Sequence, residues 1–149
     1  MTAAVTNSTC LIGLERIQRL DILPQVFDPI AVPPVVQSEV GISASWLTVQ
    51  ATRNRGMVQS LQTQIDAGEA EAIALAMELR DVFVILDDLS ARRIAQQLGL
   101  KVIGTVGLLV RAKQQDVISE IKPILDALTT ANFRISDALI RKALQLADE

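Results

Sequence analysis

The stretch Val82-Phe83-Val84-Ile85-Leu86-Asp87-Asp88 decides the fold class of this chain. Its unbroken apolar run is typical of a strand that is buried on both faces inside a parallel sheet. The two aspartates then stand at the carboxyl end of that strand, where open parallel sheets place their ligand sites. The stretch therefore predicts a central parallel strand with a polar site beside its end.

Strand and helix patterns alternate on both sides of this stretch. Strands are predicted at Ala3–Thr6, Pro29–Pro33 and Lys101–Ile103, and a half-exposed edge strand is predicted at Trp46–Thr52. Helices are predicted from the Ser8 or Thr9 cap to Leu20 and at Leu23–Phe27, Pro34–Val40, Met57–Ile65, Glu69–Arg80, Ala91–Leu98, Thr105–Lys113, Glu120–Thr130 and Ser136–Ala147. A basic turn is expected at Arg53–Gly56. The alternation predicts an α/β fold: a three-layer α/β/α sandwich with a central, mainly parallel sheet, formed as a single domain over residues 1–149.

The composition excludes several classes of protein. Half of the 149 residues are hydrophobic, which excludes a disordered chain. The longest apolar runs, Val82–Leu86 and Val102–Val110, are too short to cross a membrane, so we expect no membrane partner. The first residues lack a basic segment and a cleavage site, so we expect no secretory signal and a cytoplasmic protein.

The residue inventory also limits the chemistry. The chain has no His and one Cys, Cys10, which excludes the usual zinc and haem ligand sets and excludes Ser-His-Asp and Cys-His catalysis. The net charge of −3 argues against a dominant basic surface for duplex DNA. With only 3% aromatic residues, we expect no platform for base stacking.

Acidic residues are therefore the remaining candidates for catalysis. Glu39 follows Val35 and Val36 at helical spacing, and Glu69 shares a helix face with apolar residues that follow it, whereas Glu71 is expected to look partly outward. Asn7 ends the first strand as Asp87 and Asp88 end the central one. These positions are expected to gather at one edge of the sheet. Crowded carboxylates repel one another, and an oxygen-only ligand set favours Mg²⁺ or Mn²⁺, which activates water for attack on a phosphodiester.

Each position also has a purely structural interpretation. Asp66 and Glu69 have the spacing of a capping box at the start of a helix. Asp88 can form an i,i+4 ion pair with Arg92, and either Asp87 or Asp88 can cap the next helix. Asn7 can serve as a cap or turn residue, and Glu39 can face water at a helix end. Both interpretations are open at this point.

Six segments, taken in order, resemble the PIN-domain family, and specifically its group of short prokaryotic proteins predicted to bind nucleic acid. The resemblance spans nearly the whole chain. The segments are Val5-Thr-Asn-Ser-Thr-Cys-Leu-Ile12, Leu20-Asp-Ile-Leu23, Val32-Pro-Pro-Val-Val-Gln-Ser-Glu-Val40, Gly68-Glu-Ala-Glu-Ala-Ile-Ala-Leu-Ala76, Leu86-Asp-Asp-Leu-Ser-Ala-Arg92 and Gly104-Thr-Val-Gly-Leu-Leu-Val-Arg-Ala-Lys113.

The resemblance implies a metal-dependent endoribonuclease that cleaves single-stranded RNA with Mg²⁺ or Mn²⁺, in a family whose members are often toxins of toxin-antitoxin pairs. It places the family's acidic site on Asn7, Glu39, Glu69 and Asp88, with Asp87 beside the last. PIN nucleases usually carry Asp where this chain has Asn7. The resemblance further implies that Ser8 or Thr9 is the small polar residue of the site and that an antitoxin protein is a partner.

Two other hypotheses belong to different classes. A PIN-like module could bind RNA or protein with reduced or no catalysis. A receiver domain is suggested by Asp87-Asp88, Thr105 and Lys113, but receivers place the acidic pair after the first strand. Basic candidates for phosphate contacts are Arg53, Arg55 and Arg92.

A stripe of apolar residues near the C-terminus is wider than one helix face needs: Ile135, Leu139, Ile140, Ala143, Leu144 and Ala147. Soluble proteins normally reserve such exposed apolar surface for interfaces. A symmetric homodimer is therefore expected.

Overall fold

A five-stranded parallel sheet lies at the centre of the protein in the computed structural model, which describes residues 1–149. The strands stand in the order β3-β2-β1-β4-β5, and every neighbouring pair is parallel. Their bounds are β1 (Ala4–Thr6), β2 (Ile30–Val32), β3 (Leu47–Val49), β4 (Phe83–Ile85) and β5 (Lys101–Ile103). The predicted α/β class and the edge position of the strand after Trp46 are confirmed. The Val82–Leu86 run forms β4, an interior strand with a neighbour on each side, while the middle strand is β1.

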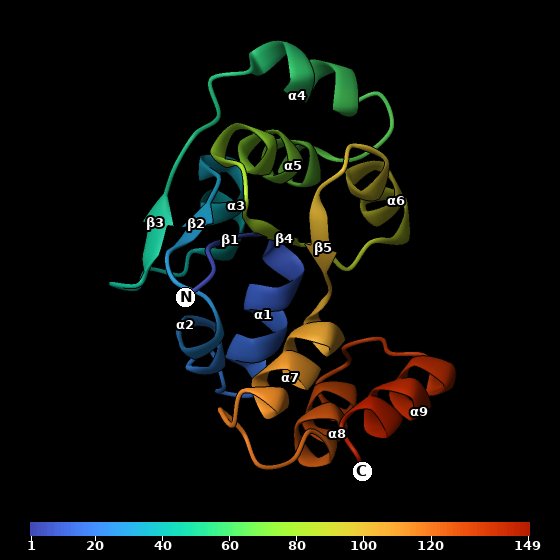
Figure 1. Ribbon diagram of the computed structural model, residues 1–149. Helices are drawn as coiled ribbons and strands as arrows, with labels where there is room; N and C mark the ends of the chain where they lie inside the picture. The colour runs from blue at the N-terminus through green and yellow to red at the C-terminus, as the bar shows by residue number, and fades with distance from the viewer.

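Helices cover both faces of this sheet, as Figure 1 shows. Their bounds are α1 (Ser8–Arg16), α2 (Ile22–Val26), α3 (Pro34–Val40), α4 (Arg55–Leu61), α5 (Ala67–Leu79), α6 (Leu89–Gln97), α7 (Thr105–Gln114), α8 (Lys122–Thr130) and α9 (Asp137–Leu146). Helices α4, α5 and α6 lie on one side, and α1, α2 and α7 lie on the other with α8 and α9 outside them. Strand β4 contributes to both cores, because Val84 packs into the apolar cluster under α5 and α6 while Ile85 packs into the cluster under α1 and α7.

Local capping signals explain where several helices begin and end. Pro34 stands in the first turn of α3, and Gly41 ends that helix in the left-handed region at φ 64°. The expected basic turn at Arg53–Gly56 is wrong. The side chain of Asn54 accepts a hydrogen bond from the Met57 N–H at 3.1 Å, and α4 therefore begins at Arg55.

The apolar stripe near the C-terminus packs mostly against the rest of the chain. Ala143 and Ala147 are buried, and Ile135, Ile140 and Leu144 are partly buried against the core. Only Leu139 among the six is exposed, with 43% of its surface accessible. The interpretation of this stripe as a surplus for a dimer is therefore wrong for most of its members, because these side chains already pack against α7 and the core of the same chain.

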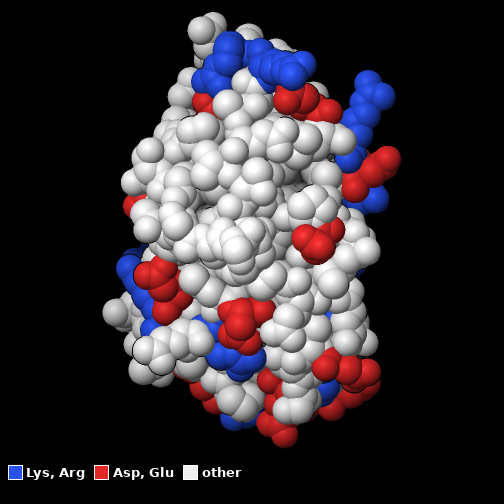
Figure 2. Space-filling model, turned by 90° about the vertical axis from the view of Figure 1, so that its left-hand side faces the viewer, with Lys and Arg blue, Asp and Glu red and all other residues white.

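A different face of the protein carries little charge. Figure 2 looks at the side of the molecule on which β3, β2 and α2 lie in Figure 1, and the middle of this face has few Lys, Arg, Asp or Glu side chains. β3 is an edge strand here, and Val49 at its end is 49% exposed. An open strand edge beside an uncharged surface is a place where another chain can pair. None of the helices has the length and apolar character needed to span a bilayer.

Homodimerisation stays a prediction, and the exposed residues define its test. Leu139→Arg is expected to dissociate a dimer built on α9, and Val49→Arg is expected to dissociate a dimer built on the edge of β3, because a charged side chain is costly to bury in an apolar interface. Light scattering at micromolar concentration measures the mass of each variant. A monomeric mass for the unaltered protein contradicts the dimer.

Candidate functional site

The carboxyl edge of the sheet brings together residues that are far apart in the sequence. Asn7 follows β1, Asp87 and Asp88 follow β4, and Thr105 follows β5. Because the strands are parallel, the helices that directly follow them begin at this same edge. Helix α5 leads back to the start of β4 at the opposite edge, so the first turn of α5 also lies at the carboxyl edge. The N-termini of α1, α5, α6 and α7 therefore surround one small region.

Glu69 lies in the first turn of α5 and is 8% exposed. The Glu69 N–H donates to Asp66 Oδ1 at 2.8 Å, and the Asp66 N–H donates to Glu69 Oε1 at 3.2 Å, so the capping-box interpretation is confirmed. The pKa of the Glu69 carboxyl is raised to about 7, chiefly by burial and in smaller part by the nearby charges of Asp66 and Asp88. Glu69 is thus both a capping residue and a member of an acidic cluster.

Asp88 stands at the opposite wall of this cluster and caps α6. Its Oδ2 accepts a hydrogen bond from the Ala91 N–H at 3.0 Å, and its other carboxylate oxygen makes no hydrogen bond within the protein. Arg92 does not pair with Asp88 as the alternative interpretation expected. Its guanidinium instead donates to the Leu86 carbonyl at 2.9 Å.

Asn7 completes the cluster from β1. It holds the N-cap position of α1, yet its side chain makes no capping hydrogen bond, and the residue is 7% exposed. A Cβ on Gly68 would lie 3.2 Å from Asn7 Oδ1 and 3.4 Å from the side chain of Val36. Gly68 therefore lets the first turn of α5 approach the Asn7 amide oxygen closely.

A hollow of about 450 Å³ opens beside the carboxylates of this cluster, and Asn7 is not among the residues that line it. Asp66, Glu69 and Asp88 lie in its wall, together with the connection between α4 and α5 and Ser90. The connection contributes three neutral polar side chains, Gln62, Thr63 and Gln64. Sequence reasoning treated Asp66 only as a cap and did not identify these polar residues, because nothing in the local pattern shows that a connecting segment faces a distant strand end.

Asp87 points away from the cluster. Its Oδ1 accepts from the Thr105 N–H at 2.8 Å, and its Oδ2 accepts from the Thr105 hydroxyl at 2.6 Å, which ties the end of β4 to the start of α7. Cys10 lies nearby, and burial followed by the charge of Asp87 raises the pKa of its thiol to about 12. The Cys10 thiol therefore stays protonated and inert at neutral pH.

Two expectations about acidic residues are wrong. Glu39 is exposed on the last turn of α3 and is not among the charges that act on Glu69, so it does not share the buried face of that helix. Glu71 is buried instead of facing outward, because Arg55 on α4 forms an ion pair with its carboxylate. The Arg55 Nη1 donates to Glu71 Oε2 at 3.0 Å and Nη2 donates to Glu71 Oε1, which raises the pKa of Arg55.

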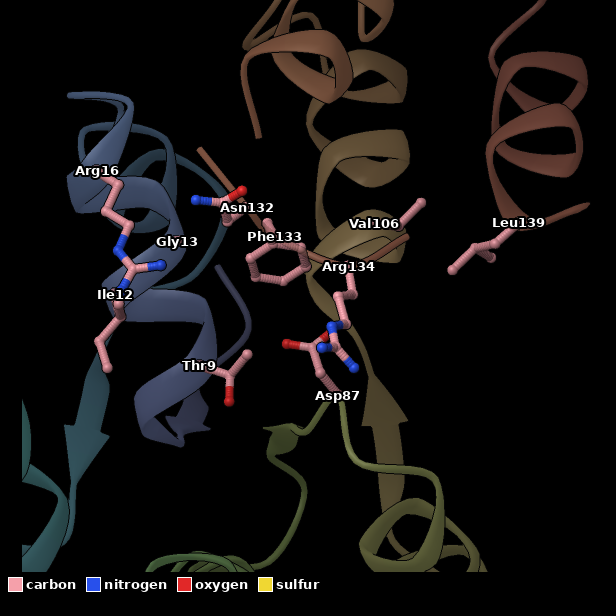
Figure 3. A pocket seen from close by; sticks show the side chains of 10 residues that line it. All are labelled: Thr9, Ile12, Gly13, Arg16, Asp87, Val106, Asn132, Phe133, Arg134 and Leu139. Carbon is pink, nitrogen blue, oxygen red and sulfur yellow. The ribbon is translucent and has the colours of Figure 1, made fainter. Parts of the chain in front are cut away.

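The remaining predicted site residues stand around the edge. Ser8 is half-buried and Thr9 exposed in the first turn of α1, and Thr9 lies in a cavity with Asp87 (Figure 3). Arg53 is exposed before α4, while Arg92 lies in a hollow with Asp87. Glu69 and Asp88 thus share one hollow, and Asn7 lies against Gly68 in the first turn of α5. Asp87 turns toward Thr105, and Glu39 is exposed on α3. The binding roles of all these residues stay predictions.

Comparison with known proteins gives the family. A family model described as a PIN domain matches residues 3–149, and the chain belongs to this PIN-domain family. PIN domains are generally nucleases and typically use divalent metals. The predicted resemblance is confirmed, and the fold is nuclease-like. No curated protein matches the chain.

The residues at the edge are compatible with a hard divalent cation. No group of three acidic or thiol side chains is arranged to hold a metal. Mg²⁺, however, is commonly held through one or two carboxylates and keeps several waters. Glu69 and Asp88, which line the hollow, and the amide oxygen of Asn7 close to Gly68 offer such an all-oxygen set.

The two neighbouring aspartates are expected to respond differently to substitution. Asp87→Ala removes both bonds to Thr105 and is expected to lower the free energy of unfolding by about 1.5–3 kcal/mol. Asp88→Asn keeps a capping oxygen for Ala91 and is expected to change stability by less than about 0.5 kcal/mol. Urea unfolding in the presence of a chelator measures both. Equal losses would contradict the division of roles.

The raised pKa of Glu69 predicts a pH dependence of stability. Below pH 4.5 its carboxyl is protonated in the folded and unfolded states alike, and between 4.5 and about 7 the folded state holds the proton more tightly. This contribution to the free energy of unfolding is therefore lost as the pH rises through that window. Glu69→Gln removes the loss and keeps an acceptor for the Asp66 N–H.

The experiment compares the melting temperature of Glu69→Gln with that of the unaltered protein, with chelator present. The variant is expected to be more stable at pH 8, and the difference is expected to disappear at pH 4. Glu120→Gln, at an exposed residue without hydrogen bonds, is the matched control. A variant that is less stable at pH 8 shows that the charge of Glu69 favours the fold, contrary to this prediction.

Proposed function

We propose that this protein is a metal-dependent endoribonuclease that cleaves phosphodiester bonds of single-stranded RNA. The observation that carries the proposal is the cluster of Glu69, Asp88 and Asn7 at the carboxyl edge of a nuclease-like fold. Burial of a carboxyl to the point that its pKa reaches about 7 opposes folding, and such arrangements concentrate at functional sites. A purely structural cap gains nothing from that burial.

Glu69, Asp88 and the amide oxygen of Asn7 would hold the cation. Bound there, Mg²⁺ or Mn²⁺ supplies positive charge for the phosphate oxygens and lowers the pKa of water. The capping hydrogen bonds fix the side chains of Glu69 and Asp88 on rigid helix ends. Asn7 would add an oxygen ligand for the metal without a further negative charge. The neutral amide lowers the repulsion between the site and an RNA phosphate, and it also lowers the affinity of the site for the metal.

The walls of the hollow suit a flexible polyanion. Gln62, Thr63, Gln64 and Ser90 line it with neutral groups that donate hydrogen bonds. Amide and hydroxyl donors bind ribose and phosphate oxygens in any sequence, since they do not read base edges. This supports the cleavage of RNA with little sequence preference. Cleavage by a toxin that an antitoxin restrains rests on the family resemblance and stays a prediction.

A PIN-like binding module with little catalysis is the second candidate. The neutral Asn7 and the lack of three convergent acids favour it, because both reduce the affinity of the site for metal. The two functions differ in what Asp88 does. In a nuclease Asp88→Asn abolishes cleavage, whereas in a binding module it leaves the RNA affinity unchanged and there is no cleavage to lose.

The test incubates purified protein with a labelled single-stranded RNA and either Mn²⁺ or Mg²⁺. Slow cleavage is expected, and a chelator or Asp88→Asn is expected to abolish it because each removes part of the metal site. Asp126→Asn, which alters an exposed acid on α8 paired with Lys122, is the matched control and should cleave normally. Cleavage that survives both the chelator and Asp88→Asn excludes the proposed metal site.

A further inference from the structure

A second cavity, of about 420 Å³, has Asp87 in its wall (Figure 3) and shares no lining residue with the acidic hollow. One wall is a face of α1 that includes Thr9 and Arg16, and another is the connection between α8 and α9, which contributes Phe133 and Arg134. Apolar side chains of α1, α7 and α9 complete the lining. The volume is within the range of small-ligand sites, and the proposed cleavage reaction does not use this cavity.

Close packing holds the cavity in shape. A Cβ on Gly13 would lie 2.7 Å from two carbons of the Phe133 ring, so only glycine lets the ring rest this near to α1. The connection that carries the ring is fixed by backbone hydrogen bonds, from the Asn132 N–H to Thr129 and from the Phe133 N–H to Leu128. Little reordering is therefore needed before a ligand binds.

Two unpaired cations line this preformed cavity. Arg16 and Arg134 are exposed, and neither takes part in an ion pair or a side-chain hydrogen bond. Figure 3 shows the ring of Phe133 between their side chains in this view. The one acid in the lining, Asp87, already accepts two hydrogen bonds from Thr105. The cavity thus combines an aromatic ring with two guanidinium groups that lack an anion.

We propose that this cavity binds one nucleotide of the RNA strand, adjacent to the link that is cleaved. The base packs on Phe133 and the apolar lining, and Arg16 and Arg134 bind the phosphate, since guanidinium groups match phosphate oxygens geometrically. Asp87 lies in this cavity and Asp88 in the acidic hollow, and their Cα atoms are about 3.8 Å apart along the chain. One strand can therefore occupy both. The proposal rests on the proposed RNA substrate.

The experiment measures binding of a short fluorescein-labelled single-stranded RNA by anisotropy, with chelator present so that no cleavage occurs. Phe133→Leu keeps an apolar side chain and removes the ring, and it is expected to weaken binding about 10-fold. Arg16→Gln and Arg134→Gln are each expected to weaken binding and to reduce the slope of log affinity against log salt by about 0.7. Arg141→Gln, at an exposed position on α9 outside the cavity, is the control.

Several outcomes overturn the proposal: no RNA binding by the unaltered protein, unchanged binding by Arg16→Gln and Arg134→Gln, or an equal loss in Arg141→Gln. A competition experiment compares inorganic phosphate with uridine monophosphate as displacers of the RNA. If the two displace it equally well, the cavity has no site for the base. Thermal unfolding checks each variant, and the two arginine variants decide the question if Phe133→Leu unfolds.

This experiment is separable from the test of cleavage. If the protein binds RNA through Phe133 and the two arginines but does not cleave it with Mn²⁺, the nucleotide site stands and the nuclease proposal is excluded. If instead the protein cleaves RNA and all three cavity variants bind RNA as tightly as the unaltered protein, the nuclease proposal stands and the nucleotide site is excluded.

Discussion

Four helix N-termini meet at the carboxyl edge of the sheet, and in three of them an acid accepts a hydrogen bond from the first turn. Asp66 caps α5, Asp88 caps α6, and Asp87 accepts the first N–H of α7. The unpaired N–H groups and the positive end of each helix dipole stabilise a carboxylate, which offsets part of the repulsion among neighbouring acids. The protein can therefore concentrate negative charge at one edge. Glu69 marks the limit of this stabilisation, because burial still raises its pKa to about 7.

Because these acids cap helices, the same residues stabilise the fold and form the candidate site. The cap on α5 is a capping box whose second acid belongs to the cluster, and the cap on α6 is the other acid of that cluster. Removing either acid therefore affects the helix and the site together. Only substitutions that keep a hydrogen-bond acceptor and remove the charge separate the two effects.

Features of the sequence that depend on near neighbours predicted the structure well. The apolar run before Asp87 marks a strand covered on both faces, and the alternation after Trp46 marks an edge strand. Gly41 and the spacing of Asp66 and Glu69 gave the end of α3 and the start of α5. In each case the physical cause, such as a cap, a left-handed residue or a period of two, lies within a few residues.

Features that depend on distant neighbours were missed. Helical spacing placed Glu39 beside Val36, but Glu39 is exposed, while Val40 in the same turn packs against the core. Glu71 is buried because α4 supplies Arg55, which periodicity within α5 does not reveal. The low aromatic content suggested no stacking surface. A single ring, Phe133, still forms one wall of a cavity because it rests on Gly13 from the other end of the chain.

Side chains between Ile85 and Leu89, in the junction of β4 and α6, point alternately to the two sides of the sheet. Asp87 faces Thr105 on one side of the sheet, and Asp88 faces Glu69 on the other. Adding or removing one residue here would exchange the two acids, so that the residue which anchors α7 would enter the acidic hollow. The number of residues in the junction is therefore constrained as strictly as their identity. Length variation among relatives should accumulate instead in connections that do not set this alternation.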